Sequence, residues 1–246
     1  MALLDVQRVS KAFGGVQANS DVSIQVEEGS IIGLIGPNGS GKTTLFNSIV
    51  GTHPIDNGEV YFKGQPLSRL RTSAIARRGL LRTFQQTRIY GQMNCMQNML
   101  ISEPHTSDRV LDMFRPHDPE LHERAEGLLE FVGLYEKRLL FAGDLSFGQQ
   151  KLLEFAMALM NDPTMLLLDE PTAGINPTLI NGLIDRLRRA NEERNVTLLV
   201  IEHNMRVIMN LAQRIYCMAH GRMLAEGPPE EIRDNPDVID AYLGGH

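Results

Sequence analysis

The sequence has little that would hold a protein in a membrane or send it out of the cell. No apolar run approaches the roughly 20 residues that a bilayer-spanning helix needs. The longest runs, such as Met165–Leu168 and Thr197–Ile201, have the length of a strand. The first residues, MALLDVQRVSKAF, also lack the basic start, long apolar stretch and small-residue cleavage site of a signal peptide. We therefore expect a chain that neither crosses a membrane by itself nor is secreted.

Cysteine and positive charge are also scarce. The 246 residues include only two cysteines, Cys95 and Cys217, and neither belongs to a metal-binding or redox motif. We expect two buried, unreactive thiols in a reducing compartment. The formal net charge of −6 disfavours a general nucleic-acid binder. The acid is concentrated in residues 85–162, where twelve Asp and Glu and seven Lys and Arg give a balance of −5.

The order of apolar patterns predicts an α/β protein with an inserted helical part. Strand patterns fill the first 35 residues, a glycine-rich loop and a helix ending at Gly51 follow, and short strands continue to about residue 86. Residues 89–162 have a helical pattern that is interrupted by a polar surface connection near 103–120. After Pro163 strands and helices alternate again. Such alternation implies a mostly parallel sheet covered on both faces, shared by the two β-rich parts.

A glycine-rich loop carries the first chemical signal. Residues 36–43, GPNGSGKT, match G-x-x-x-x-G-K-[ST] in full, after an apolar strand and before a helix. Glycines let the backbone N–H groups curl around phosphate oxygens, and the helix N-terminus adds the positive end of its dipole. Lys42 would supply charge to the β- and γ-phosphates, and the Thr43 hydroxyl would ligate Mg²⁺. The residues expected to bind nucleotide here are Gly36, Pro37, Asn38, Gly39, Ser40, Gly41, Lys42, Thr43 and Thr44.

A second signal for phosphate chemistry is the segment MLLLDEP, residues 165–171. Its apolar strand would end with Asp169 at the carboxyl edge of the sheet, beside the glycine-rich loop, where the carboxylate can hold the Mg²⁺ shell. Glu170 would face the attacking water and polarise it as a general base. A carboxylate after a strand is also a common helix cap, but the upstream loop favours the functional interpretation.

Three motifs in this order carry a specific resemblance. The glycine-rich loop, LSFGQQ at 145–150 and LLLDEPTAGINP at 166–177 resemble the nucleotide-binding subunit of an ATP-binding cassette (ABC) transporter. The resemblance extends from Leu3 to the C-terminus. It implies a single ABC domain: a P-loop NTPase core with a mixed β-sheet and an antiparallel β subdomain, residues 1–86 and 163–246, and an inserted α-helical signature subdomain, residues 87–162.

The resemblance assigns roles to residues outside the phosphate loop. Phe13 lies where the family stacks an aromatic ring on adenine, although a core phenylalanine is the alternative. Gln85 matches the Q-loop glutamine, which touches Mg²⁺ and the attacking water; Gln86 is a less favoured neighbour. Residues 173–176 match the D-loop. His203 matches the switch histidine at the γ-phosphate, although an isolated histidine after a strand is commonly structural.

The segment LSFGQQ is expected to act on a second subunit. Ser146 and Gln149 have capping-box spacing, so a helix should begin there, and a helix start with a free hydroxyl and Gly148 is an anion site. In the family, two subunits hold two ATP molecules head to tail, and each supplies this motif to the other's γ-phosphate. The family consensus has glycine where Phe147 stands. We interpret Phe147 as subfamily variation; the alternative is that it weakens the second site.

The implied activity is ATP hydrolysis without a covalent intermediate, which depends on positioning and charge stabilisation. The expected catalytic residues are Lys42, Gln85, Glu170 and His203, and the expected Mg²⁺ residues are Thr43, Gln85 and Asp169. Since a lone cassette has no membrane part, two separate permease subunits are implied. A short permease helix would enter a groove after Gln85, with Arg88, Ile89 and Tyr90 as contact candidates. The methionines at 93, 96 and 99 are expected chiefly in the subdomain core.

Softer features favour an importer of branched-chain or hydrophobic amino acids. GQQKLLEFAMALM, VIEHNM and the C-terminal GRMLAEGPPEEIRDNPDVIDAYLGG are similar to the ATPases of this subfamily. The similarity implies an ATPase at the cytoplasmic face of a bacterial inner membrane, with an identical or paralogous ATPase partner and, indirectly, a periplasmic solute-binding protein. Within the family, import of urea or short amides and export of lipopolysaccharide are alternatives. A soluble ABC protein acting on ribosomes or DNA is disfavoured by the single cassette and the lack of a basic arm.

Overall fold

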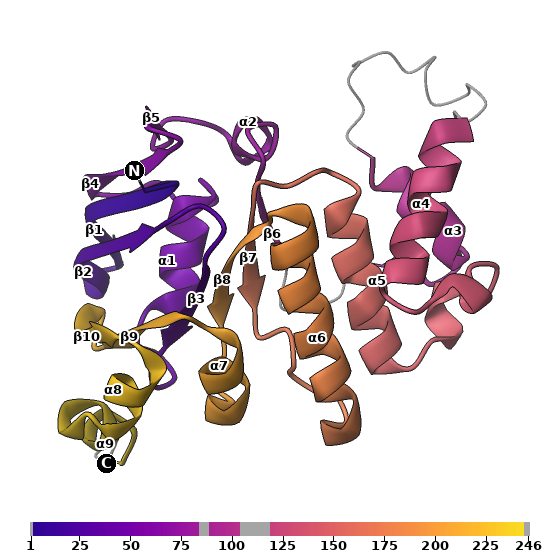
Figure 1. Ribbon diagram of the computed structural model, residues 1–246. Helices are drawn as coiled ribbons and strands as arrows, with labels where there is room; N and C mark the ends of the chain where they lie inside the picture. Colours follow the sequence, from indigo (N-terminus) through magenta and orange to yellow (C-terminus); the bar gives the residue numbers. More distant parts are fainter. Residues whose placement is uncertain (1, 84–88, 104–118, 244–246) are drawn as a thin grey trace. The chain divides into compact units, whose positions relative to one another are not determined.

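The chain folds into two compact units (Figure 1). The computed structural model describes residues 2–83, 89–103 and 119–243. The core unit comprises residues 1–82, 164–172 and 187–246, and the helical unit comprises residues 83–163 and 173–186. Three residues singled out in the sequence, Gln85, Gln86 and Arg88, and most of the polar connection near 103–120 lie outside the described residues.

The core unit is built on a six-stranded mixed sheet with the strand order β10–β9–β3–β8–β7–β6. Only the pair of β10 (Arg222–Gly227) and β9 (Arg214–Ala219) is antiparallel. The inner strands β3 (Ile31–Ile35), β7 (Met165–Asp169) and β8 (Thr197–Ile201) are buried along their whole length, and β6 (Leu80–Arg82) forms an edge. Their unbroken apolar sequences follow from cover on both faces. The predicted mixed sheet, shared by both β-rich parts, is confirmed.

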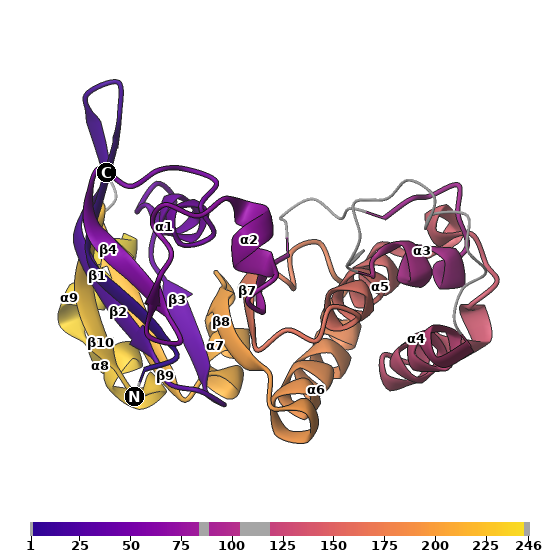
Figure 2. The same ribbon diagram turned by 90° about the horizontal axis from the view of Figure 1, so that it is seen from above.

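A second, antiparallel sheet forms from the N-terminal strands of the core unit. Its order is β2–β1–β4–β5, with β1 (Leu4–Phe13), β2 (Val16–Val26), β4 (Asn57–Phe62) and β5 (Gln65–Pro66). Along the second half of β2 buried and exposed residues alternate, as the sequence pattern predicts. Helix α1 (Lys42–Ile49) lies beside this sheet (Figure 2) and shares a hydrophobic core with residues from both sheets.

Short helices complete the core unit. They are α2 (Thr72–Ala76), α7 (Met205–Leu211), α8 (Pro229–Asp234), α9 (Pro236–Leu243) and the C-terminal part of α6 (Pro177–Arg194). Helix α7 packs directly on β3 at Gly33, where an added Cβ would lie 2.6 Å from Ile208 Cγ1. Gly51 follows α1 with a φ of +72°, so the predicted end of this helix is confirmed.

The helical unit contains α3 (Cys95–Ile101), α4 (Pro119–Phe131), α5 (Phe147–Leu159), the first part of α6, and the 3₁₀ turns η2 (Tyr135–Lys137) and η3 (Ala142–Asp144). Helices α3, α4 and α5 pack against one another. Met96 and Met99 are buried and Met93 is half-buried, so the core position predicted for the methionines is confirmed for the first two.

Two further expectations concern membranes and thiols. No helix within the described ranges is both long and apolar enough to span a bilayer. Cys95 and Cys217 are free and buried, as predicted. Burial raises the pKa of the Cys217 thiol to about 11, so this thiol stays protonated and unreactive at neutral pH.

Candidate active site

The glycine-rich loop lies between the end of β3 and the start of α1 and is packed backbone against backbone. Gly36, Gly39 and Gly41 have φ values of +145°, +79° and +96°, a range that residues with a Cβ rarely adopt. An added Cβ at Gly36 would lie 2.1 Å from the Met218 carbonyl oxygen, and one at Gly41 would lie 2.3 Å from the Ala18 carbonyl oxygen. Because these neighbours are backbone atoms of other strands, the loop shape requires glycine at both positions.

The side chain of Lys42 lies inside the curl of this loop. Its Nζ donates hydrogen bonds to the carbonyl oxygens of Gly36 and Pro37, at 2.8 and 3.0 Å, and to Ser40 Oγ at 3.3 Å. Burial lowers the pKa of Lys42, and the negative charges of Glu170 and Asp169 oppose this shift. The two carboxylates therefore lie near enough to Lys42 to act on its charge.

Two acidic residues and a histidine lie at or just after the ends of strands β7 and β8, at the same edge of the sheet. Asp169 ends β7, in register with Ile201 at the end of the parallel strand β8. Glu170 follows with a φ of +50°, and its N–H donates to the Ile201 carbonyl oxygen at 2.9 Å. A non-glycine residue with a positive φ is uncommon and is often found at functional sites. His203, after β8, makes a 2.5 Å hydrogen bond between its Nε2 and Glu170 Oε1.

Glu202 fixes the two loops that follow these strands. Its buried carboxylate accepts hydrogen bonds from the Thr172 N–H at 2.9 Å and from the Thr172 hydroxyl at 2.5 Å. It also accepts bonds from the backbone N–H groups of His203, at 3.1 Å, and Asn204, at 3.3 Å. Glu202 could not be predicted from the sequence, because an acidic residue beside the expected histidine has no spacing that marks it.

Arg82, at the end of β6, is a second residue that the sequence analysis missed. Its guanidinium donates from Nη2 to Asp169 Oδ2 and from Nη1 to Asn47 Oδ1, both at 2.6 Å. It also lies 5.6 Å from the centre of the Phe46 ring. Both charged side chains are buried, with 7% and 1% of the surfaces of Arg82 and Asp169 exposed. Arg82 therefore holds one oxygen of Asp169.

The remaining oxygen of Asp169 is suited to a metal shell. Oδ1 is buried and has no hydrogen-bond partner among the described residues. Nowhere in the described ranges do three or more His, Cys, Asp or Glu side chains group as metal ligands. A site with one carboxylate and an exposed Thr43 hydroxyl suits Mg²⁺, which keeps several waters and binds substrate phosphates.

Phe13, the residue predicted for adenine, is at the end of β1. Its side chain is 44% exposed, so the alternative of a core phenylalanine is wrong. The ring contacts His53 edge to face, with centroids 5.2 Å apart, and Lys11 Nζ lies 5.3 Å from its centre. An exposed ring beside a cation provides a flat surface on which a base can stack.

The signature segment starts α5 in the helical unit. Ser146 is the N-cap: its Oγ accepts from the Gln149 N–H at 3.4 Å, and Gln149 Oε1 accepts from the Ser146 N–H at 3.1 Å. The predicted capping box is therefore confirmed. Ser146 is exposed and Gly148 is buried. The segment thus presents a serine hydroxyl at a helix N-terminus on the surface of this unit.

Phe147, the departure from the family pattern, packs on the D-loop. Its ring lies over Gly174, where an added Cβ would be 2.8 Å from Phe147 Cε1, and Gly174 has a φ of +73°. The ring is 47% exposed. The ring contact and the positive φ together favour glycine at 174, and the contact links the signature segment to residues 173–176.

Replacement of Arg82 by Met should destabilise the protein by about 3–5 kcal/mol, because it leaves the Asp169 carboxylate buried without its cation. The free energy of unfolding, measured with urea, checks this. The matched control is Arg82→Met combined with Asp169→Asn, which removes both charges and should recover most of the loss. A cost below about 1 kcal/mol for Arg82→Met alone would contradict the buried ion pair.

Gly174→Ala should lower the stability of the helical unit by about 1–3 kcal/mol, through its positive φ and the clash with the Phe147 ring. Thermal unfolding measures the loss. Phe147→Ala in the same chain should restore part of it, because the clash disappears while the φ penalty remains. Gly127→Ala, in the open surface of α4, is the control and should be neutral or slightly stabilising. No rescue by Phe147→Ala would show that the ring does not constrain Gly174.

Comparison with protein families gives two matches. A family described as ABC transporter matches residues 19–173, and a family described as branched-chain amino acid ATP-binding cassette transporter matches residues 222–246. The first match includes the glycine-rich loop, the signature segment and Asp169. The second covers β10 and the two C-terminal helices.

Individual proteins resemble the chain over its whole length. The high-affinity branched-chain amino acid transport ATP-binding protein BraF of Pseudomonas aeruginosa is 40% identical, and the corresponding protein LivG of Escherichia coli is 38% identical; each alignment covers 98% of both chains. A crystal structure of the ADP conformation of an ATP-binding cassette of an ABC transporter has a TM-score of 0.90 with 34% identity and covers 99% of both chains. With a matching family model over more than half of the chain and these full-length relatives, the chain belongs to the ABC transporter family and is one of its nucleotide-binding ATPase subunits.

Proposed function

We propose that this chain hydrolyses ATP to drive a bacterial importer of branched-chain or hydrophobic amino acids, at the cytoplasmic face of the inner membrane. The observation that carries the proposal is the combined match: relatives aligned over nearly the whole chain are branched-chain amino acid transport ATP-binding proteins, and residues 222–246 match a family of the same description. The C-terminal match favours this solute class over urea, short amides or lipopolysaccharide.

In the proposed site, the glycine-rich loop and Lys42 hold the nucleotide phosphates. The loop N–H groups and the start of α1 would contact phosphate oxygens. Lys42, now bonded to the carbonyls of Gly36 and Pro37, would turn to the β- and γ-phosphates. The Thr43 hydroxyl and the Asp169 carboxylate would help to hold Mg²⁺, with Gln85 as a further contact. When bound, Mg²⁺ neutralises charge on the phosphates.

The proposed catalytic pair is Glu170 and His203. Glu170 would polarise the attacking water as a general base, and its hydrogen bond to His203 keeps the carboxylate oriented. His203 would contact the γ-phosphate when ATP is bound. This arrangement supports hydrolysis by positioning and charge stabilisation, and Phe13 would stack on adenine.

The site is proposed to be completed by a second ATPase subunit, identical or paralogous. Ser146 is exposed at the N-terminus of α5, a 13-residue helix whose dipole favours an anion there. The helical unit that carries Ser146 does not include the glycine-rich loop, so the phosphate that this serine contacts must be held elsewhere. We therefore infer that Ser146, Gly148 and Gln149 contact the γ-phosphate held by the partner, as in the family's head-to-tail arrangement.

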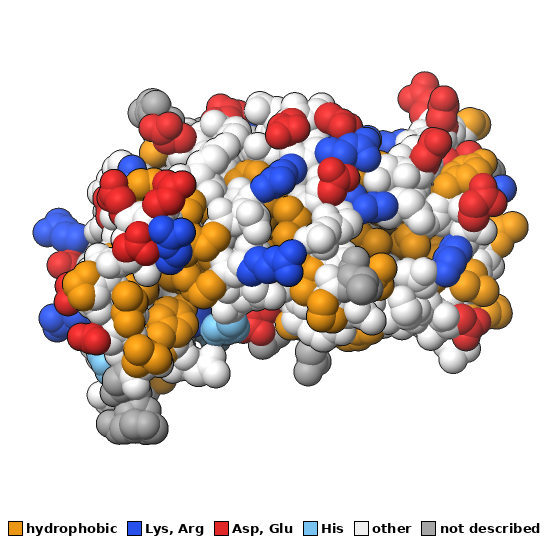
Figure 3. All heavy atoms as spheres, turned by 60° about the horizontal axis from the view of Figure 1, so that its bottom comes forward, with side chains coloured by type: hydrophobic (Ala, Val, Ile, Leu, Met, Phe, Trp, Pro, Cys, Tyr) orange, Lys and Arg blue, Asp and Glu red, His pale blue; other side chains and the backbone are white. Residues whose placement is uncertain are grey.

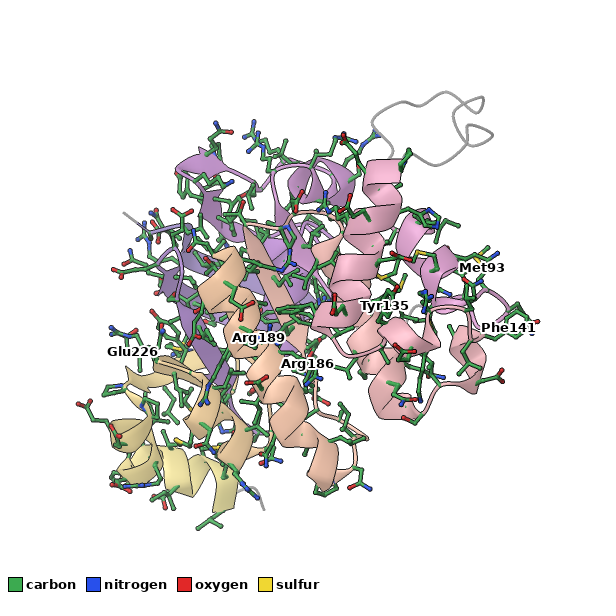
Figure 4. All side chains as sticks on the ribbon, turned by 45° about the vertical axis from the view of Figure 1, so that its right-hand side comes forward. Met93, Tyr135, Phe141, Arg186, Arg189 and Glu226 are labelled. Carbon is green, nitrogen blue, oxygen red and sulfur yellow. The ribbon has the colours of Figure 1, made fainter. Side chains whose placement is uncertain are left out.

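The proposed contact for the permease subunits lies on the helical unit. Tyr90 and Phe141 are each 55% exposed and Leu139 is 73% exposed. The segments that carry them are adjacent, because the Gly143 N–H donates to the Gly91 carbonyl and the Ala142 N–H to the Met93 carbonyl. Figure 4 shows Phe141 beside Met93 at the outer edge of this unit. An exposed apolar strip of this kind suits a short cytoplasmic permease helix.

The solute is tested by reconstitution. The chain is purified with its partner ATPase, two permeases and a solute-binding protein, and the complex is placed in proteoliposomes loaded with ATP. Radiolabelled leucine should accumulate only when ATP and the binding protein are both present, and excess urea should not compete. Uptake of urea instead of leucine would contradict the solute class, and co-sedimentation of the chain with ribosomes in place of the permeases would contradict transport.

Glu170→Gln should reduce ATP turnover by at least about 100-fold, because the amide cannot accept the proton of the attacking water. Binding is expected to persist, so the variant should still form an ATP-dependent dimer with its partner ATPase in size-exclusion chromatography. Glu193→Gln, which changes an exposed carboxylate paired with Arg189, is the matched control and should keep the wild-type rate. Wild-type turnover by Glu170→Gln would disprove the assignment of the base.

A further inference from the structure

The C-terminal helix α9 reaches the glycine-rich loop through one side chain. The Gly36 N–H donates a 2.8 Å hydrogen bond to the Tyr242 hydroxyl, although the two residues are 206 positions apart. Partial burial raises the pKa of this hydroxyl, although 37% of the residue's surface is exposed, so the hydroxyl remains neutral at physiological pH. Tyr242 lies in the C-terminal segment that matches the second family, outside the segment 19–173 that matches the ABC transporter family as a whole.

Among the glycines of the loop, Gly36 makes the closest approach to a neighbouring backbone. It is buried, and its Cα faces the Met218 carbonyl of β9 too closely for any side chain. Its own carbonyl accepts the Lys42 ammonium at 2.8 Å. The same residue is therefore bonded to Tyr242 through its N–H and to Lys42 through its oxygen. A buried N–H group without a hydrogen-bond partner costs free energy. Without the Tyr242 hydroxyl, the Gly36 end of the loop is therefore expected to shift.

The C-terminal segment formed by α8 and α9, which carries Tyr242, also borders α7, the helix after His203. A surface hollow of about 480 Å³ is lined by residues of α7, which begins at Met205, and of α8 and α9. Its walls are mainly apolar side chains, among them Met209, Ile232, Val238 and Tyr242 itself. Hydrophobic side chains gather on this face of the core unit (Figure 3). This C-terminal segment is thus adjacent both to the glycine-rich loop and to α7, which follows His203.

We propose that Tyr242 is a positioning residue of the nucleotide site, which holds Gly36 in place while Lys42 exchanges the loop carbonyls for phosphate. This rests on the proposed phosphate-binding role of residues 36–44. When Lys42 turns to the nucleotide, Gly36 loses its bond to the ammonium but keeps the bond to Tyr242. The N–H groups of the loop then keep the arrangement that binds phosphate. The entropy cost of ordering the loop when nucleotide binds is therefore smaller.

The test is Tyr242→Phe, which removes only the hydroxyl. Affinity for ADP in the presence of Mg²⁺, measured by isothermal titration calorimetry, should fall about three- to tenfold, the effect of one hydrogen bond. In the ATPase assay with the partner subunit, KM for ATP should rise while kcat changes by less than about twofold. Hydrogen exchange at the Gly36 amide should become faster.

The matched control is Tyr216→Phe. The Tyr216 hydroxyl is also bonded to backbone, accepting from the Gln25 N–H and donating to the Gln25 carbonyl, but it does not touch the loop. This variant should keep the wild-type affinity and the wild-type Gly36 exchange rate. An unchanged affinity in Tyr242→Phe, or an equal loss in both variants, would overturn the inference. Failure of the wild-type protein to bind ADP would instead overturn the proposed function, and the inference with it.

Discussion

The close approach of backbone to backbone around the glycine-rich loop is the constraint on which the rest of the site depends. Gly36 and Gly41 press against carbonyl oxygens of neighbouring strands, and this contact gives the loop its curl. The curl places carbonyl oxygens around Lys42, and the position of Lys42 beside Asp169 and Glu170 follows from it. The proposed phosphate site is therefore a property of main-chain packing, and the side chains of Lys42, Glu170 and His203 would add charge and a base to it.

The sequence predicted those features that depend on local spacing. The glycine-rich loop, the apolar strand that ends at Asp169, the Ser146–Gln149 capping box and the inserted helices are all short-range patterns with a fixed period or offset. The fold class followed, because alternating strands and helices leave few ways to build a parallel sheet. The exposure of Phe13 was expected from the family resemblance alone, since a single aromatic residue at a strand end has no pattern that separates surface from core.

Contacts between distant segments lay beyond sequence reasoning. Arg82 meets Asp169 across 87 positions, Glu202 meets Thr172 across 30, and Tyr242 meets Gly36 across 206. No spacing in the sequence predicts the partner of any of these residues, because strand order and the path of the C-terminal helices decide which residues meet. Phe147 illustrates the same limit: its departure from the family pattern was visible, but its contact with Gly174 was not.

The carboxylate of Glu202 has a consequence for motion in this region. It is anchored on one side by the threonine that follows the β7 loop and on the other by the amides that open the β8 loop. Both loops are hydrogen-bonded to the same buried carboxylate. One loop therefore cannot move away from the other without leaving that charge unpaired in the interior. The backbones of the two loops that carry Glu170 and His203, the proposed base and switch histidine, should consequently move together.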